Sequence, residues 1–341
     1  MRKRLFFIGL VVLALLLTPV MYITANSRES NLERSEKKSF GEDIKNLSAW
    51  VVYWDLNSDK EIKALDKRLK NISYFAANFD SNNKLAMPED LTNYYNKTKN
   101  DKYNKYITIV NDKVKIDGSY SLKDTSLLKA LLDTPDSRSS HIEGIINLAV
   151  KHGFDGIEID YEQIKKDMGL WNNYISFINE LYEKAQNRGL KVRVVLEPNT
   201  PFDKLTFTEG PTYVLMCYNL HGGFNEPGEK ANAEFIENSI ESMSKVPGKK
   251  EFAIATGGFN WAANGKTTSV TEAQAVSLLK QYKATAQRHK ESQSLFFTYT
   301  DENNMKHEVW YGDKVTLDSW MKVITEKGYD VSIWRLGGNL F

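Results

Sequence analysis

Three acidic side chains are spaced two residues apart in the segment 154–162, which has the sequence Phe-Asp-Gly-Ile-Glu-Ile-Asp-Tyr-Glu. Isoleucines between acidic positions are typical of a β-strand. Because side chains alternate between the two faces of a strand, Glu158, Asp160 and Glu162 would share one face. An ordinary buried parallel strand is apolar on both faces. A strand that directs three acids to one place therefore predicts a chemical role.

These three carboxylates are close enough to alter one another's ionisation. At ~3.3 Å per residue, alternate side chains lie about 6.6 Å apart. Two charges at that distance repel by roughly 2.5 kcal/mol at an effective dielectric near 20. We expect one acid to keep its proton near neutral pH, as a general acid must. Two other interpretations stay open: a solvated acidic edge strand, and a calcium or magnesium cage, because hard cations favour clustered carboxylates.

The composition is that of a globular protein rather than of a disordered or nucleic-acid-binding chain. The 341 residues are 41% hydrophobic and 12% aromatic, which suffices for one large core. The net charge is +1, and Arg2, Lys3 and Arg4 supply three positive charges, so the remainder has no basic surplus for nucleic acid. The single cysteine, Cys217, excludes an internal disulfide and a cysteine-rich zinc site. We expect a monomer without a cofactor or metal.

The amino terminus has the pattern of an export signal. A basic start precedes the unbroken apolar run from Leu5 to Leu17, which has the length of a signal-peptide core. The longer segment 5–23 is barely enough to span a bilayer, and could anchor the protein in a membrane. We expect residues 1–25 to be a cleaved signal peptide or an uncleaved signal anchor. Residues 26–45 are charged and polar and are interpreted as a linker. The rest would be extracellular or at the cell surface.

Short strand-like runs alternate with helical ones from residue 46 to the end of the chain. Eight runs have the composition of strands: 49–54, 72–79, 106–110, 156–161, 191–196, 213–217, 252–256 and 331–334. The clearest helical patterns between them are 139–152, 171–188, 231–245 and 317–327. Such alternation predicts a parallel sheet covered by helices. Eight strands around one core predict an α/β fold, the (β/α)8 TIM barrel, over residues 46–341.

One stretch interrupts this repeat after the seventh predicted strand. We expect a helix over residues 271–288 and two strands over 295–300 and 307–311. The sequence Asp-Glu-Asn-Asn at 301–304 is a plausible turn between these strands. The stretch predicts a small α+β insertion at residues 265–312, between strands 7 and 8 and on the rim of the barrel.

Polar and aromatic side chains follow the carboxyl ends of several predicted strands. In a TIM barrel these ends meet at the face that carries the active site. Besides the acids of the fourth strand, they are Trp54, Glu197, Tyr218, Asn219, Trp261 and Trp334. Aromatic rings stack on sugar faces, while carboxylates and amides bind hydroxyl groups. The set predicts a carbohydrate site, although ordinary packing explains Trp54 and Trp261 equally well.

With these motifs in place, the sequence resembles the family-18 glycoside hydrolases from about Trp50 to its end. The family signature Asp-Gly-x-Asp-x-Asp-x-Glu stands here at residues 155–162, and residues 216–219 resemble its Met-x-Tyr-Asp element. Three more segments are similar to the branch with bacterial spore-germination and cortex-lytic glucosaminidases: 297–301, 307–310 and 333–337. The resemblance implies hydrolysis of polymers that contain β-linked N-acetylglucosamine, of the peptidoglycan or chitin type.

The resemblance also implies roles for individual residues. Glu162 would protonate the glycosidic oxygen, and the substrate's own acetamido carbonyl would then attack the anomeric carbon, with overall retention. Asp160 would orient the acetamido group and stabilise the developing positive charge. Tyr218 would hydrogen-bond the acetamido oxygen, and Trp334 would form the floor under the sugar. The further substrate-binding residues expected are Glu158, Asn219, Glu197, Trp54 and Trp261.

Two residues depart from the family pattern. Glu158 replaces the middle aspartate, which lengthens the inner end of the acidic series by a methylene group. Asn219 replaces the acid that follows Tyr218, which we expect to alter pH dependence or substrate choice. These departures leave a second function open, that of a sugar-binding wall protein with little or no turnover. The end of the seventh strand, 255–260, has no carboxylate, so a two-glutamate mechanism would have to recruit Glu197.

Overall fold

The computed structural model describes residues 44–340, except residues 56, 66 and 101. The predicted export segment 1–25 lies outside the described residues, and so does all but the end of the predicted linker 26–45. Within the part of the chain that is described, no helix is both long enough and apolar enough to cross a membrane.

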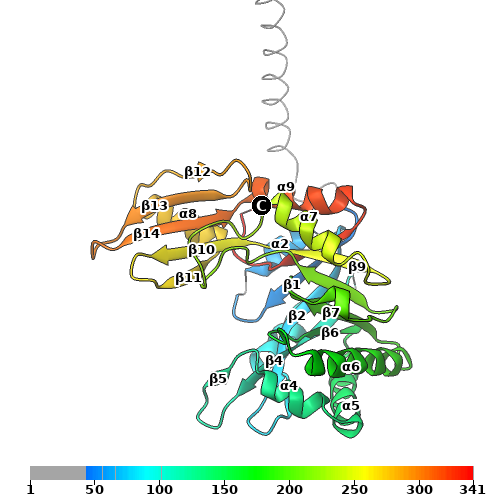
Figure 1. The fold of residues 1–341 in the computed structure, drawn as a ribbon. Helices are drawn as coiled ribbons and strands as arrows, with labels where there is room; N and C mark the ends of the chain where they lie inside the picture. The colour runs from blue at the N-terminus through cyan, green and yellow to red at the C-terminus, as the bar shows by residue number, and fades with distance from the viewer. Residues whose placement is uncertain (1–43, 56, 66, 101, 341) are drawn as a thin grey trace, which may run out of the picture. The chain divides into compact units, whose positions relative to one another are not determined.

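Eight parallel strands form a closed barrel (Figure 1). They are β1 (Leu47–Val52), β2 (Leu69–Phe79), β4 (Asn104–Val114), β6 (Gly156–Asp160), β7 (Lys191–Leu196), β8 (Thr212–Met216), β9 (Lys250–Ala255) and β15 (Asp330–Trp334). The last strand, β15, pairs in parallel with the first, β1, which closes the ring. Two short strands, β3 (Leu85–Ala86) and β5 (Tyr120–Ser121), pair antiparallel with β2 and β4, respectively. The predicted TIM barrel is confirmed.

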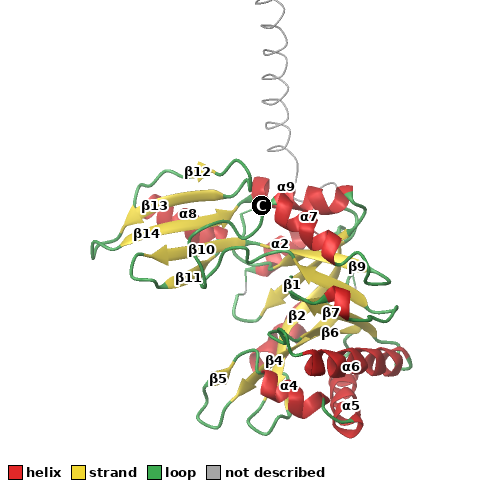
Figure 2. Ribbon diagram, viewed as in Figure 1, coloured by secondary structure: helices red, strands yellow, loops and turns green. Residues whose placement is uncertain are grey.

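Helices occupy most of the connections between these strands (Figure 2). They are α2 (Ser58–Leu65), α3 (Glu89–Thr98), α4 (Thr125–Leu132), α5 (Pro135–His152), α6 (Met168–Gln186), α7 (Ala233–Ser242) and α9 (Lys314–Glu326). The connection from β7 to β8 holds the short 3-10 helix η1 (Phe202–Lys204). The four clearest helical patterns of the sequence correspond to α5, α6, α7 and α9.

The α5 helix begins at Pro135 rather than at the predicted residue 139. The Thr134 side chain accepts a hydrogen bond from the Ser137 N–H, and the Ser137 side chain accepts one from the Thr134 N–H, which makes a capping box. Proline fits the first turn because its missing N–H would have no partner there. The helix ends at Gly153, which has a left-handed φ of 74°. Local capping therefore explains both ends.

The interior of the barrel contains a buried ionic contact between three strands. Arg193 of β7 donates a hydrogen bond to Glu158 of β6 at 2.8 Å and another to Glu251 of β9 at 2.7 Å. All three side chains are almost completely buried. Buried charges persist only where they are paired and hydrogen-bonded. In agreement, although burial raises the pKa of Glu251, the charges of Arg193 and Lys249 and the hydrogen bonds to it together lower this pKa to about 2.

A second, antiparallel sheet is inserted between β9 and α9. Its strands, in sheet order, are β11 (Thr267–Val270), β10 (Gly257–Ala262), β14 (Lys306–Gly312), β13 (Leu295–Thr300) and β12 (Gln287–Arg288). The α8 helix (Glu272–Gln281) belongs to the same insertion, and its Ala275 packs with Phe297, Val309 and Tyr311 in a separate apolar cluster. The predicted α+β insertion between strands 7 and 8 is therefore present.

Two boundaries of the insertion differ from the prediction. The inserted sheet starts at Gly257 rather than at residue 265, because the chain turns there with a φ of 61° and enters β10. The predicted helix 271–288 is too long, since α8 ends before Lys283, which has a left-handed φ of 50°. The last two residues of that range pair with β13 instead.

Candidate active site

Glu162 lies just beyond the carboxyl end of β6, where a buried amide fixes its backbone. The Glu162 N–H donates to Oδ1 of Asn111 at 3.0 Å, and Nδ2 of Asn111 donates to the Glu162 carbonyl at 3.1 Å. Asn111 belongs to the neighbouring strand β4 and is buried. This pair of bonds holds the backbone of Glu162 at the mouth of the barrel.

Asp160 is the last residue of β6 and is buried. Burial, together with the charges of Glu162 and Glu158, raises the pKa of Asp160 well above its ordinary value. Its Oδ1 atom has no hydrogen-bond partner among the described residues. A buried oxygen without a partner is costly. Asp160 therefore offers an acceptor, or a proton when protonated, to a group that enters the site.

Glu162 forms an ion pair with Lys123 of the loop between β5 and α4. Burial raises the pKa of Glu162, and the Lys123 ammonium opposes this effect only in part. Lys123 has a positive φ of 53°, and its side chain is 43% exposed. Sequence reasoning missed Lys123, because it lies on a loop and no motif or spacing connects it with the acids.

Tyr218 follows β8 and contributes a buried phenol to the same mouth. Burial raises its pKa well above the ordinary value, and the charges of Asp160 and Glu162 raise it further. The phenol therefore stays protonated at neutral pH and can donate a hydrogen bond. Tyr218 packs in a cluster with Trp50 and Trp334. The structure thus brings Glu162, Asp160 and Tyr218 together.

Aromatic rings line the region between β15, β1 and β2. The ring of Trp334 meets Phe75 edge to face at 4.7 Å and Trp50 at 5.9 Å. Trp54 contacts Phe75 at 6.0 Å and is 54% exposed, so one face of its ring is available for stacking on a sugar. Phe75 was missed by sequence reasoning, because one phenylalanine within an apolar strand carries no distinguishing signal.

Glu197 and Asn219 occupy loops at this face of the barrel. Oε2 of Glu197 accepts a hydrogen bond from the backbone N–H of Gln163 at 2.7 Å, and its charge raises the pKa values of Asp160 and Glu162. Glu197 therefore supports the loop that follows Glu162 as well as the local negative field. Asn219 is exposed with a φ of 65°, a left-handed conformation that asparagine tolerates better than most residues.

Glu158 does not belong to the substrate-binding residues, and the prediction that placed it there is wrong. Its side chain is 0% exposed. Its donors are Trp50, Ser73, Thr108 and Arg193. Each of its two carboxylate oxygens thus accepts two hydrogen bonds inside the barrel. The three acids therefore do not converge on one cation, and the described residues contain no group of His, Cys, Asp or Glu side chains suited to a metal.

Trp261 lies on β10 of the inserted sheet rather than at the end of a barrel strand. It is buried, and its Nε1 donates to the Gly222 carbonyl at 3.1 Å. The same residue lines a groove of about 980 Å³ between the loop 223–227 and the inserted sheet. Phe224, which is 72% exposed, stands in that loop. Trp261 thus helps to join the insertion to the loop after Asn219.

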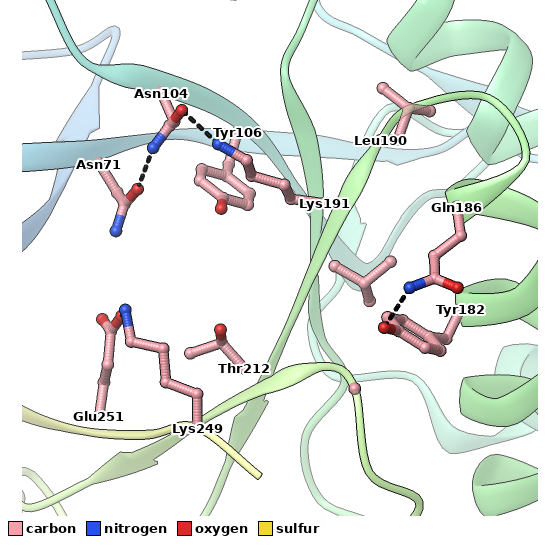
Figure 3. A pocket seen from close by; sticks show the side chains of 12 residues that line it. Asn71, Asn104, Tyr106, Tyr182, Gln186, Leu190, Lys191, Thr212, Lys249 and Glu251 are labelled. Carbon is pink, nitrogen blue, oxygen red and sulfur yellow. Dashed lines mark hydrogen bonds and ion pairs between the residues drawn. The ribbon is translucent and has the colours of Figure 1, made fainter.

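A second cavity, of about 350 Å³, lies where the barrel strands begin (Figure 3). Asn104, the first residue of β4, accepts a hydrogen bond from Lys191 at 2.6 Å and donates one to Asn71 at 2.8 Å. Thr212 and Lys249 also line it. None of the predicted site residues does. Polar contacts at this end of a barrel serve stability, because the reacting groups lie at the opposite end.

A closed (β/α)8 barrel that presents a carboxylate pair, a phenol and a tryptophan at the carboxyl ends of its strands has the architecture of the barrel glycoside hydrolases. The chain belongs to the glycosyl hydrolases family 18, whose family model matches residues 49–339. The resemblance drawn from residues 155–162 and 216–219 is thereby confirmed.

Curated proteins and solved structures similar to this chain agree with that assignment. The uncharacterized glycosylase YvbX of Bacillus subtilis (strain 168) is 27% identical over 63% of this chain and 66% of its own length. The cortical fragment-lytic enzyme of the same organism is 24% identical over 61% of this chain and 52% of its own length. The chain thus spans about half to two thirds of these relatives.

The fold also matches that of a solved chitinase from Chromobacterium violaceum ATCC 12472. The two structures superpose with a TM-score of 0.71 and 18% identity, over 87% of this chain and 95% of the chitinase. At this identity the likeness concerns the fold.

Proposed function

We propose that this protein is a retaining glycosidase that hydrolyses polymers containing β-linked N-acetylglucosamine. The observation that supports the proposal best is the juxtaposition of Glu162 with Asp160, whose buried Oδ1 has no partner among the described residues. An acid with a raised pKa can donate a proton near neutral pH, and a free buried acceptor beside it suits the N–H of an acetamido group.

The proposed reaction uses the substrate's own acetamido group as the nucleophile. Glu162 donates its proton to the glycosidic oxygen while the bond from that oxygen to the anomeric carbon breaks. The acetamido carbonyl oxygen forms the new bond, and Asp160 stabilises the positive charge of the resulting ring. Tyr218 donates a hydrogen bond to the acetamido oxygen. Glu162, now ionised, takes a proton from the water that opens the intermediate, and the anomeric configuration is retained.

The nature of the substrate is supported by the relatives and by the shape of the site. Two of the similar proteins are named as a cortical fragment-lytic enzyme and a chitinase, and the second name refers to the breakdown of a polymer of N-acetylglucosamine. The exposed ring of Trp54 at the mouth of the barrel can stack on a sugar, whereas the groove beside Trp261 is lined by none of Glu162, Asp160 and Tyr218. Peptidoglycan and chitin-type chains both contain N-acetylglucosamine and are the two candidate substrates.

The first test is the Glu162→Gln variant of the full-length protein, assayed for release of reducing ends from peptidoglycan fragments and chitin oligomers. We expect turnover to fall by about 10²–10⁴-fold, because the proton donor is lost, while oligosaccharide binding persists. The exposed Glu183→Gln variant serves as the control. Residual turnover above about one hundredth of the wild-type value, after deamidation is excluded, would reject Glu162 as the acid.

A second test addresses the nucleophile. Oligosaccharides whose cleaved sugar has a free amine or a hydroxyl in place of the acetamide should be cleaved far more slowly, because no carbonyl is available to attack. Equal rates for the two kinds of substrate would contradict substrate assistance and would favour a nucleophilic carboxylate, for which Glu197 is the candidate at this mouth.

One observation favours the second candidate function, sugar binding with little turnover. The ion pair with Lys123 stabilises the ionised form of Glu162, and an ionised acid cannot protonate a leaving group. The same assays decide between the two functions. Tight binding of N-acetylglucosamine oligomers without any release of reducing ends, by wild-type protein at every pH, would assign the chain to the sugar-binding proteins.

Residues 1–25 support the further proposal that the protein acts outside the cytoplasmic membrane, either released or anchored by segment 5–23. Amino-terminal sequencing of the mature protein from membrane and medium fractions tests this. A start near residue 26 in the medium indicates cleavage, whereas an intact start in the membrane fraction indicates an anchor. Full-length protein confined to the cytoplasm would contradict export.

A further inference from the structure

Lys123 holds the candidate proton donor in an ion pair although it does not belong to any motif of the site. Its ammonium contacts Oε2 of Glu162, and the side chain remains 43% exposed. The backbone of the residue is fixed, because the Lys123 N–H donates to Oδ1 of Asp112 at 2.7 Å. A fixed backbone with a half-exposed, flexible side chain allows the ammonium to change partners without any movement of the loop.

Several acidic groups around Glu162 influence whether its carboxyl group is protonated. The charges of Glu197, just after β7, and Asp112 of β4 raise the pKa of Glu162, and the pKa of the neighbouring acid Asp160 of β6 is raised by the charge of Glu162 in turn. Among the described residues, Lys123 is the cation that forms an ion pair with Glu162. Without the ammonium, burial and these three acids would all favour the protonated form of Glu162. The ion pair therefore favours the ionised form of Glu162, against the effect of burial and of these acids.

The ion pair opposes the chemistry that the site is proposed to perform. A general acid must carry its proton when the leaving group departs, whereas the ion pair with Lys123 favours the carboxylate. The contact must therefore open in the productive complex. A half-exposed ammonium at the mouth exchanges its partner most readily for another anion, because charge-assisted hydrogen bonds are the strongest that a lysine makes.

We propose that Lys123 is a specificity-determining residue that binds a carboxylate of the substrate next to the cleaved bond, and that this exchange releases Glu162 to take up a proton. The inference rests on the proposed glycosidase function and names its substrate class. The preferred glycan carries a carboxylate on a sugar beside the cleaved bond, as the lactyl ether of muramic acid does in peptidoglycan. Neutral chitin lacks such a group.

The acids around the site strengthen this assignment. A substrate carboxylate that approaches Asp160, Glu197 and Asp112 is repelled unless a cation receives it. Lys123 supplies that cation at the point where the leaving group must receive its proton from Glu162. A neutral sugar gains nothing from Lys123 and has to bind while the ion pair persists. The same lysine therefore favours one substrate class and disfavours the other.

The experiment compares matched substrates with the full-length protein. One is a tetrasaccharide of alternating N-acetylglucosamine and N-acetylmuramic acid with free lactyl carboxylates. The second is the same tetrasaccharide with these carboxylates converted to amides, and the third is chitotetraose. For wild-type protein we expect kcat/KM for the acid form to exceed that for the amide form by roughly ten- to a hundredfold, with a smaller ratio at high salt.

Two substitutions of Lys123 and one control variant test whether the positive charge of this residue sets the preference. Lys123→Met should reduce the preference for the acid form to about onefold, and Lys123→Arg should retain part of it, because the positive charge remains. The matched control is Lys115→Met, which removes an exposed lysine from the nearby β4–β5 connection. Lys115→Met should leave the ratio at the wild-type value.

The pH profile on the amide substrate gives a second readout that a merely structural lysine would not change. The ion pair favours the ionised form of Glu162, so its removal raises the pKa of this acid. In Lys123→Met, the alkaline limb of kcat/KM on the amide substrate should therefore move to higher pH. An unfolded or misassembled variant would lose activity at every pH instead.

The outcomes distinguish this inference from the proposed function. If wild-type protein cleaves the acid and amide forms equally well, or if Lys123→Met keeps both the preference and the alkaline limb, the assignment of Lys123 is wrong and the glycosidase function stands. If wild-type protein cleaves none of the three substrates, while Glu162→Gln and wild type bind them alike, the proposed function itself fails.

Discussion

Glu158 shows how a single methylene group is accommodated inside the barrel. Its carboxylate receives hydrogen bonds from residues of four strands: Trp50 of β1, Ser73 of β2, Thr108 of β4 and Arg193 of β7. The family pattern has aspartate at this position. The longer side chain of glutamate suits this chain because its four donors surround the place that the longer carboxylate reaches.

We predict that the family-like substitution Glu158→Asp destabilises this protein. The shorter carboxylate cannot reach all four donors, and buried donors without a partner are costly. The expected loss is about 1–3 kcal/mol in the free energy of unfolding, measured by urea denaturation. The control is Glu183→Asp on the exposed face of α6, which should change stability by no more than about 0.5 kcal/mol. Equal stability of Glu158→Asp and wild type would contradict the role given to the four hydrogen bonds of Glu158.

At the scale of elements, two glycines show opposite relations between backbone and surroundings. Gly144 lies on the exposed side of α5, and a Cβ added there would meet no atom within 4 Å. Gly258 lies on β10, where a Cβ would come within 1.7 Å of the Trp310 carbonyl oxygen of the neighbouring strand. The first glycine weakens its helix, whereas the second permits close strand pairing.

The two alanine substitutions should therefore have opposite signs. Gly144→Ala is expected to stabilise the protein by about 0.5–1 kcal/mol, because alanine restricts the unfolded chain and favours the helix. Gly258→Ala should destabilise it by about 1–3 kcal/mol, because the backbone of the inserted sheet must move to accept the methyl group. Urea denaturation of both variants measures the difference. Changes of the same sign would contradict the strand spacing at Gly258.

At the scale of the whole molecule, the candidate site makes the free energy of unfolding depend on pH. Burial and neighbouring acids raise the pKa of Asp160, so the folded state binds its proton more tightly than the unfolded chain does. Stability contributed in this way is greatest at low pH and falls as the pH rises from the unfolded value toward the folded pKa. Above the unfolded pKa, the raised pKa of Asp160 therefore lowers the stability of the fold relative to low pH.

We predict that Asp160→Asn increases stability more at pH 8 than at pH 5. Asparagine removes the ionisation, so the variant loses the decline in stability that wild-type protein shows as the pH rises. Urea midpoints at the two pH values measure this, and activity should fall in the same variant because the acetamido group loses its anionic partner. The exposed Asp203→Asn variant is the control. A gain that is larger at pH 5 would reverse the sign and reject the burial argument.

The sequence by itself determined the barrel, the inserted α+β unit and the position of the acids. Alternating strands and helices are local patterns, and the order of eight such units leaves little choice of topology. The signature at residues 155–162 placed Asp160 and Glu162 at the end of the fourth strand, since strand ends in a barrel share one face. Capping residues such as Thr134 moved individual boundaries by only a few positions.

Only the tertiary structure decided which side chains reach the site. Glu158 and Glu162 look alike in the sequence. In the structure, Glu158 accepts hydrogen bonds from residues of four strands, whereas Glu162 forms an ion pair with a lysine from a loop. Trp261 similarly belongs to the inserted sheet rather than to a barrel strand. Periodicity reports which face of an element a residue occupies. Its partners depend on where other elements lie in space, and no local pattern records that.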